Sequence, residues 1–114
     1  MNKFQEGKIY VIKSPSTSNI YIGATTQPLN TRFSEHKCHY KRYIAGLRNY
    51  TNSYDIIKLD DAFIELLEEY KCNNKQELLD KEKAYITKYL DNAVNRQAKR
   101  LRHLTQLGKQ NEDL

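Results

Sequence analysis

The sequence of 114 residues lacks several features that would assign it to a well-defined class of protein. No apolar run approaches 18 residues, so we expect no transmembrane helix and no membrane partner. The first six residues contain no apolar signal-peptide core, which predicts an intracellular protein, in the cytoplasm or the nucleus. Cys38 and Cys72 are the two cysteines, and their separation is not that of metal ligands. We therefore interpret both cysteines as reduced thiols.

Acidic charge is scarce in the first half of the chain, although the net charge of the whole is only +5. Residues 1–53 carry eight Lys or Arg against two acidic residues, whereas residues 54–90 carry six basic and nine acidic residues. The basic half is interleaved with tyrosines, namely Tyr10, Tyr21, Tyr40, Tyr43 and Tyr50. This combination suits a polyanion with stackable bases. An ordinary solvated surface has the same composition, so charge alone leaves nucleic-acid binding open.

Residues 7–13 and 19–24 have strand-like composition, and the turn-favouring residues 14–19 lie between them. This pattern predicts a hairpin. If the loop closes symmetrically, Tyr10 lies opposite Gly23 and Tyr21 lies opposite Ile12. Side chains alternate between the faces of a strand, so these four residues share one face. Both phenols then project together, and the missing side chain at Gly23 leaves space beside Tyr10.

A helix is predicted after the hairpin, with Pro28 in its first turn and Gly46 at its end. Arg32 and His36 are four residues apart, so their side chains project from the same side of this helix. They lie beside an apolar stripe formed by Leu29, Phe33, Tyr40, Ile44 and Leu47.

The second half of the chain gives weaker patterns. Residues 48–53 have the composition of a loop, and residues 54–59 are too few to assign. Residues 63–70 fit a helix by propensity and a half-buried strand by alternation. A second helix is predicted to begin at Asn74, with Glu77 three residues later as in a capping box. Its apolar face contains Leu78, Leu79, Tyr85, Ile86 and Tyr89.

Glu82 interrupts that apolar face, because it lies four residues after Leu78 and four before Ile86. An ionised carboxylate in apolar surroundings costs several kcal/mol unless it is paired or bound to a metal. Alternatively, Glu82 lies at the edge of the face and reaches water or a lysine such as Lys81 or Lys83. The pattern alone leaves both interpretations open.

The last segment, residues 95–114, predicts an amphipathic basic helix whose end we expect to fray from Gly108 onward. Such a helix packs on the domain, touches a phosphate backbone or pairs with a partner. Its apolar residues are Ala98, Leu101, Leu104 and Leu107.

The order of six polar and aromatic residues resembles the GIY-YIG nuclease family. The matching positions are Lys8-Ile9-Tyr10, Tyr21-Ile22-Gly23, Arg32, His36, Glu82 and Asn95. The family's first triplet begins with glycine, whereas this chain has Lys8 there and Gly7 one residue earlier. The resemblance implies a small α/β (α+β) domain over residues 1–95, followed by a basic C-terminal helix or tail over residues 96–114, partly disordered at its end. The expected architecture is a three-stranded, mainly antiparallel sheet flanked by helices, with a strand at residues 63–70.

The resemblance also implies roles for the hairpin and first-helix residues. Tyr10 matches the general base, Tyr21 matches the tyrosine that supports the phosphate and the water network, and Gly23 admits close approach. Arg32 and His36 match the helix arginine and histidine. A guanidinium can clamp a phosphate, and an imidazole with a pKa of about 6.5 can relay a proton or donate to the phosphate. A tyrosine can accept a proton from water only if its own pKa is lowered or if it passes a proton onward.

Glu82 matches the family's metal ligand, which implies a single Mg²⁺ or Mn²⁺ ion. Mg²⁺ keeps several waters and phosphate oxygens as ligands, so one carboxylate can hold it. Asn95 matches the late asparagine that ties the site together. Lys13 and Lys37 are further candidates for binding the substrate.

The sequence therefore predicts a divalent-metal-dependent DNA endonuclease that hydrolyses phosphodiester bonds in duplex or branched DNA. Two alternatives remain at this point: a non-catalytic nucleic-acid-binding module, or a catalytic subunit that needs a partner in DNA repair or processing. A protein partner or a homodimer is also open. Binding is expected to weaken with salt, since phosphate contacts release counterions.

Overall fold

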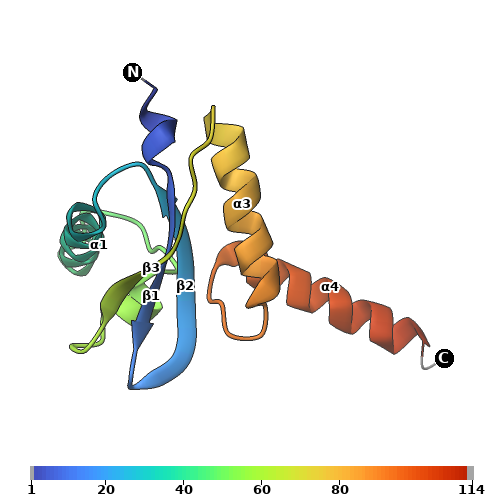
Figure 1. Ribbon diagram of the computed structural model, residues 1–114. Helices are drawn as coiled ribbons and strands as arrows, with labels where there is room; N and C mark the ends of the chain where they lie inside the picture. Colours follow the sequence, from blue (N-terminus) through green and yellow to red (C-terminus); the bar gives the residue numbers. More distant parts are fainter. Residues whose placement is uncertain (1, 113–114) are drawn as a thin grey trace.

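A three-stranded antiparallel sheet in the order β2-β1-β3 organises the part of the chain that the structure describes (Figure 1). The structure is a computed structural model that describes the backbone of residues 2–112 and the side chains of residues 2–104. Its elements are the 3-10 turn η1 (Lys3–Glu6), β1 (Lys8–Ser14), β2 (Thr17–Thr25), α1 (Leu29–Ile44), α2 (Tyr54–Ile57), β3 (Phe63–Glu69), α3 (Lys75–Lys88) and α4 (Arg96–Glu112). Helices flank the sheet, which confirms the expected α+β fold.

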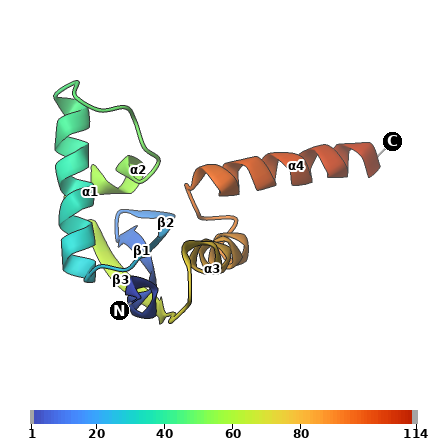
Figure 2. The same cartoon turned by 90° about the horizontal axis from the view of Figure 1, so that it is seen from above.

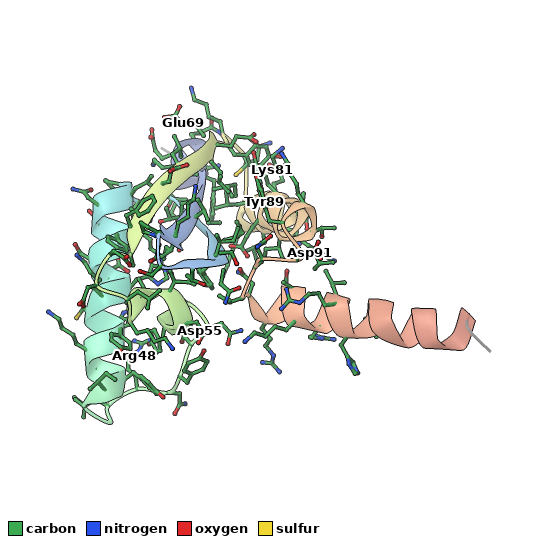
Figure 3. The ribbon with its side chains drawn as sticks, turned by 90° about the horizontal axis from the view of Figure 1, so that it is seen from below. Arg48, Asp55, Glu69, Lys81, Tyr89 and Asp91 are labelled. Carbon is green, nitrogen blue, oxygen red and sulfur yellow. The ribbon has the colours of Figure 1, made fainter. Side chains whose placement is uncertain are left out.

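Helices cover both faces of the sheet, and α4 extends away from the body of the molecule (Figures 1 and 2). The helices α1 and α2 pack on one face, whereas α3 packs along β2 on the other. Figure 3 shows the two layers by their side chains, with Arg48 and Asp55 on the α1 and α2 side and Lys81 and Tyr89 on the α3 side. The edge strand β2 is therefore the element that both layers approach.

The central strand β1 is buried on both of its faces, as expected for a strand with helices above and below. Ile9 and Val11 belong to the core under α3, whereas Tyr10 and Ile12 belong to the core under α1 and α2. All four side chains are at most 2% exposed. The alternation of β1 thus points Tyr10 at the α1 layer.

The hairpin register agrees with the prediction from the sequence. Tyr10 pairs with Gly23, and Ile12 pairs with Tyr21. The predicted loop at residues 14–19 is too long, because the strands continue to Ser14 and resume at residue 17. Turn-favouring serine and threonine side chains occupy strand positions here, and the register shifts between Ile12 and Ser14.

The helix α1 begins directly after Pro28 and is followed by Gly46, which has a φ of +79°. Glycine adopts that left-handed conformation without the steric cost that a Cβ brings. The predicted apolar stripe is wrong at its C-terminal end, since Ile44 and Leu47 are 65% and 67% exposed. Ile44 is the last residue of α1, and Leu47 lies beyond its end.

The structure resolves the ambiguous middle of the chain. Phe63–Glu69 form β3, as the family resemblance implied for residues 63–70, and the unassigned segment contains the single turn α2. The predicted capping box of α3 is present in part: Asn74 Oδ1 accepts from Glu77 N at 3.0 Å, and Glu77 reaches back to the N–H of Asn73 at 2.7 Å. Leu79, predicted to lie on the apolar face, is 39% exposed.

The helix α4 is fixed to the domain at its first two turns. Ala98 is fully buried, and Arg102 Nη1 donates to the carbonyls of Leu90 and Ala93. The helix runs to Glu112; the end of the expected fraying tail, residues 113–114, lies outside the described residues. Within the described residues, no helix has both the length and the hydropathy that crossing a bilayer requires.

Candidate active site

Three of the predicted site residues form one hydrogen-bonded cluster. The register of β1 aims Tyr10 at α1, where Arg32 and His36 lie one helical turn apart. The Tyr10 hydroxyl lies 2.7 Å from His36 Nε2, and Arg32 Nε donates to the same hydroxyl oxygen at 3.3 Å. His36 is 4% exposed and Tyr10 is 1% exposed. Three residues from two separate elements therefore meet at one phenol oxygen.

Gly23 makes this cluster sterically feasible. A Cβ built on Gly23 would lie 2.3 Å from both Cζ and Oη of Tyr10, well inside the contact distance. The ring of Tyr10 thus lies across the backbone of the neighbouring strand. The space expected beside Tyr10 is present, and the phenol itself fills it.

The protonation states in the cluster follow from burial. Burial, together with a smaller contribution from the nearby Arg32 charge, lowers the pKa of His36 to about 3, so the imidazole is neutral near pH 7. Burial raises the pKa of Tyr10 well above 10, although Arg32 opposes this shift. Because Arg32 donates to the phenol oxygen, we assign the Tyr10 proton to the bond with His36 Nε2. That assignment places the imidazole proton on Nδ1.

The ring of Tyr21 also lies beside His36. The centroids of the Tyr21 and His36 rings are 5.8 Å apart in an edge-on arrangement, and those of Tyr10 and His36 are 5.9 Å apart. Burial raises the pKa of Tyr21, and the negative charge of Glu82 adds to the shift. Both phenols of the hairpin are thus neutral and flank one imidazole, as the shared face of the hairpin predicted.

Glu82 projects from α3 toward the edge strand β2. It is half-buried and makes no ion pair with any other described residue; Lys81 pairs instead with Glu68 at 3.5 Å. Burial raises the pKa of the Glu82 carboxyl, whereas the backbone N–H of Ala24 and the charge of Arg32 lower it. The lysine partner that the sequence left open for Glu82 is therefore not found among the described residues.

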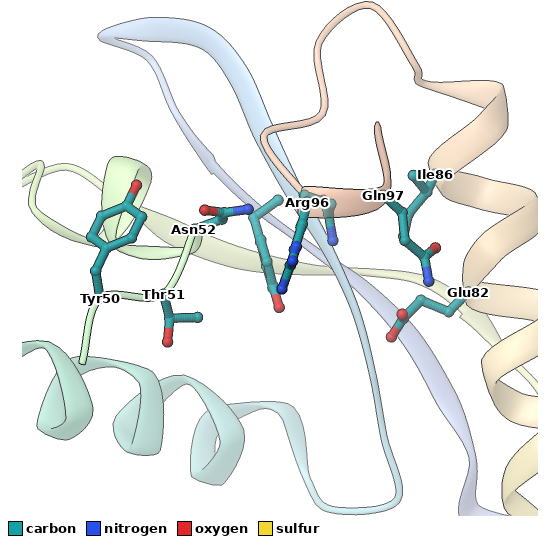
Figure 4. Close-up of a pocket in the computed structure, with 9 residues that line it drawn as sticks. Tyr50, Thr51, Asn52, Glu82, Ile86, Arg96 and Gln97 are labelled. Atoms are coloured by element: carbon teal, nitrogen blue, oxygen red, sulfur yellow. The ribbon is translucent and has the colours of Figure 1, made fainter. Parts of the chain in front are cut away.

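The carboxylate of Glu82 lies in a cavity of about 310 Å³ beside β2. Its lining comes from β2, α3, the start of α4 and the loop before α2, through Tyr21, Glu82, Ile86, Asn95, Arg96, Gln97, Tyr50, Thr51 and Asn52. Figure 4 shows Tyr50 and Glu82 flanking the cavity, with Asn52 and Arg96 between them. The last five of these residues could not be placed here from the sequence, because a loop and a helix start carry no periodic pattern that puts them near β2.

Asn95 holds the edge strand rather than pointing freely into solvent. Its Oδ1 accepts from the N–H of Ile22 at 2.9 Å, and its Nδ2 donates to the carbonyl of Ile22 at 2.7 Å. The backbone just before it pairs with Ile20, through Val94 N to Ile20 O at 2.8 Å and Ile20 N to Asn92 O at 2.9 Å. The segment therefore continues the sheet beyond β2 and fixes the residue that follows Tyr21.

The remaining predicted residues lie less centrally. Lys13 is on the α3 face of the sheet, where it pairs with Glu65 at 3.5 Å, so the structure does not bring it to the cluster. Lys37 is exposed on α1, with its ammonium 4.7 Å from the centre of the Phe33 ring. Arg32 has an additional partner that the sequence analysis missed, Glu35, at 3.2 Å.

The donor set of the cavity fits a single hard cation. Glu82 is the one acidic residue among the described residues that line the cavity, and its carboxylate makes no ion pair with another described residue. No group of three or more His, Cys, Asp or Glu gathers among the described residues, so an all-protein cage is not offered. One carboxylate with water and phosphate oxygens is a coordination that suits Mg²⁺ or Mn²⁺.

Comparison with known proteins agrees with this geometry. A family model of the GIY-YIG catalytic domain matches residues 6–96, which is most of the chain and ends where α4 begins. No curated protein and no solved structure matches the chain significantly. The match spans the hairpin tyrosines, the α1 pair, Glu82 and Asn95. The chain therefore belongs to the GIY-YIG catalytic domain family, a family of endonucleases that act on DNA and generally depend on a divalent metal.

Proposed function

We propose that this protein is a divalent-metal-dependent DNA endonuclease that hydrolyses phosphodiester bonds at the Tyr10, His36 and Glu82 site. The observation that carries the proposal is the phenol of Tyr10, buried and bonded to both a neutral imidazole and a guanidinium. A purely structural tyrosine needs one partner for its hydroxyl. An oxygen held between a proton acceptor and a cation is suited to proton transfer.

We propose a proton relay in which Tyr10 exchanges one proton for another. Its raised pKa makes a phenolate base unfavourable near pH 7. In the relay, a water molecule attacks the phosphorus and passes a proton to Tyr10 Oη, while the Tyr10 proton moves to His36 Nε2. The phenol stays neutral throughout, and the imidazole becomes an imidazolium. The negative charge of the nearby phosphate favours that imidazolium, which compensates for the low pKa of His36 in the free protein.

The cationic side of the proposed site consists of Arg32 and a metal ion held by Glu82. The Nη2 group of Arg32 makes no hydrogen bond with another described residue, so it is free to donate to a phosphate oxygen. A bound Mg²⁺ or Mn²⁺ ion would neutralise charge that develops on the phosphate and on the leaving oxygen. We propose that Tyr21 supports the phosphate from its place beside the site. Asn95 is proposed to hold β2, and with it Tyr21, in place.

The test is cleavage by the purified protein of supercoiled plasmid and of a branched duplex, with Mg²⁺ or Mn²⁺ and in parallel with EDTA. We expect nicked or linear products with either metal and none with EDTA. Intact DNA under all metal conditions, despite binding measured by fluorescence anisotropy, would contradict the proposal. It would favour a module that binds nucleic acid without cutting it.

A further inference from the structure

The loop at residues 48–53 forms one wall of the cavity, and buried residues at its C-terminal end hold it in place. Ser53, the last residue of this loop, and Tyr54, which follows it, are 0% and 2% exposed. The Tyr54 ring packs against Tyr43 and Tyr40, with centroid distances of 5.2 and 5.5 Å. A loop fixed by two buried residues and two aromatic contacts presents its remaining side chains in defined positions.

Tyr50 is the exposed member of this aromatic group. Its ring packs edge-on against Tyr43 and Tyr54, with centroid distances of 5.8 Å in both cases and interplanar angles of 69° and 89°. Its hydroxyl donates to Asp55, which fixes the ring orientation. The residue is nevertheless 48% exposed and lines the cavity that contains Glu82 (Figure 4). One part of a rigidly held aromatic ring is therefore open to a ligand.

Three polar side chains that line the same cavity have no partner among the described residues. Asn52, Arg96 and Gln97 line it, and none of their side chains makes a hydrogen bond or ion pair with another described residue. Two amides supply both donors and acceptors, and a guanidinium supplies donors alone. A ligand with a planar apolar face, a polar edge and a nearby negative charge would satisfy the whole lining.

We propose that Tyr50 stacks an unpaired nucleobase that lies next to the scissile phosphate, while Asn52 and Gln97 contact the edge of the base. This inference rests on the proposed function, because a metal ion held by Glu82 would place the phosphate in the same cavity. A nucleobase has a π face and a polar edge, and stacking on an aromatic side chain tolerates every base. Arg96 then lies beside the phosphate of the same nucleotide.

The inference names a substrate class, which is DNA with an unpaired nucleotide at the cleavage point, such as a flap, a bulge or a loop. A paired base inside a duplex is stacked on both neighbours and cannot offer its face to Tyr50. Extruding it costs a few kcal/mol, and least where the nucleotide is already unpaired. Fully paired DNA of the same sequence is therefore expected to bind less tightly.

The first test measures affinity without catalysis, by fluorescence anisotropy in EDTA. Two bulged duplexes are compared, one with a thymine at the bulge and one with an abasic residue, so that the base alone is removed. Stacking on an aromatic side chain predicts a Kd about 10-fold lower for the base-containing DNA. Equal affinities for the two duplexes would overturn the inference.

The second test assigns the effect to Tyr50 with a double-mutant cycle. Tyr50→Leu is expected to abolish the difference between the two duplexes, whereas Tyr50→Phe, which keeps the ring, retains it. Thermal unfolding of each variant checks that the domain is folded. A Tyr50→Leu protein that still prefers the base-containing duplex 10-fold would remove Tyr50 from the site.

These binding results are independent of cleavage. A base-dependent affinity in a protein that never cuts DNA would support the stacking site and contradict the proposed nuclease function. Cleavage with no dependence on the base in either affinity or rate would support the nuclease and contradict the stacking site. The fluorescence of 2-aminopurine at the bulge gives a third readout, since stacking on Tyr50 changes its quenching in the wild type and not in Tyr50→Leu.

Discussion

The Tyr10 hydroxyl is the residue-scale feature on which the proposed chemistry depends. It accepts from Arg32 Nε and lies 2.7 Å from His36 Nε2, while the ring fills the space over Gly23. Burial keeps the phenol protonated and the imidazole neutral. A base that is itself neutral must pass its own proton on as it receives another, so Tyr10 and His36 act as a unit.

Tyr10→Phe is expected to lower the single-turnover cleavage rate by about 10² to 10⁴, the usual range for a positioned proton-transfer group. The substitution removes one oxygen and keeps the ring, so DNA affinity in EDTA should change little. Tyr89→Phe is the matched control, because Tyr89 lines a cavity on the α3 face of the sheet, away from the cluster. A Tyr10→Phe protein that cuts at the wild-type rate would show that the hydroxyl is structural.

Gly23→Ala is expected to damage the same cluster from the opposite strand. A Cβ 2.3 Å from the phenol must displace the ring or bend β2, and overpacking of this kind costs about 1–3 kcal/mol. The displaced Tyr10 hydroxyl would leave His36, so the cleavage rate should fall by more than the loss of stability explains. Urea unfolding and single-turnover cleavage measure the two effects on one preparation.

Gly46→Ala provides the contrast for that experiment. Gly46 has a φ of +79° and open space around its Cα, so a methyl group there strains the backbone and meets no neighbour. We expect a loss of roughly 1 kcal/mol in the free energy of unfolding with an unchanged cleavage rate. If both glycine variants lost activity in proportion to stability, Gly23 would have no special role at the site.

At the scale of elements, the edge strand β2 is held by a segment that is not a strand. Residues 92–95 pair with Ile20 through the backbone and with Ile22 through the Asn95 side chain. The amide imitates a peptide group, because it accepts from the N–H and donates to the carbonyl of the same residue. This clamp lies between Tyr21 and Gly23, both of which belong to the proposed site.

Asn95→Ala should therefore loosen β2 locally. Two backbone groups of Ile22 would lose their side-chain partner inside the protein, at a cost of about 2 kcal/mol. We expect faster amide hydrogen exchange at Ile22 than at Val11, which lies opposite it on β1. Unchanged exchange at Ile22 would mean that the Asn95 side chain does not carry the clamp.

The elements also show what could be predicted from the sequence. Alternation and turn chemistry were enough for the hairpin register, and therefore for the shared face of Tyr10 and Tyr21. The helix pair of Arg32 and His36 followed from a spacing of four. The strand β3 followed from the family resemblance with only weak support from alternation, because its leucines and glutamates favour a helix locally and the pairing with β1 overrides that preference.

The parts that could not be predicted depend on long-range packing. Nothing in residues 48–53 indicates that Tyr50 and Asn52 reach the cavity of Glu82, since α1 and α2 place that loop. Lys13 differs, because the alternation that places Tyr10 and Ile12 on one face of β1 places Lys13 on the other, away from the cluster. Charge and spacing identify candidate residues, but the layer that each one faces is decided by the whole fold.

At the scale of the whole molecule, the buried His36 makes stability depend on pH. Its pKa is about 6.5 in the unfolded chain and about 3 in the folded protein, so the unfolded state binds the proton more readily between these values. The stability contributed by the neutral imidazole is complete above pH 6.5 and falls by up to about 1.4 kcal/mol per pH unit below it. The raised pKa of Glu82 acts in the opposite direction.

Comparison of variants separates the effect of His36 on stability from that of Glu82. His36→Gln is expected to flatten the decline in the free energy of unfolding between pH 6.5 and about 4.5, measured by urea titration at a series of pH values. His103→Gln, at an exposed position on α4, should keep the wild-type slope. Identical slopes in all three proteins would mean that His36 is protonated as easily in the fold as in the unfolded chain.

The most direct test of the proposed nuclease is the single-turnover cleavage rate of Glu82→Gln with Mg²⁺, alongside its DNA affinity in EDTA. Glutamine keeps the size of the side chain and removes the charge that holds the metal. We expect a rate lower by about 10² or more, with affinity and thermal stability close to those of the wild type. Mg²⁺-dependent cutting by Glu82→Gln at the wild-type rate would contradict the proposal.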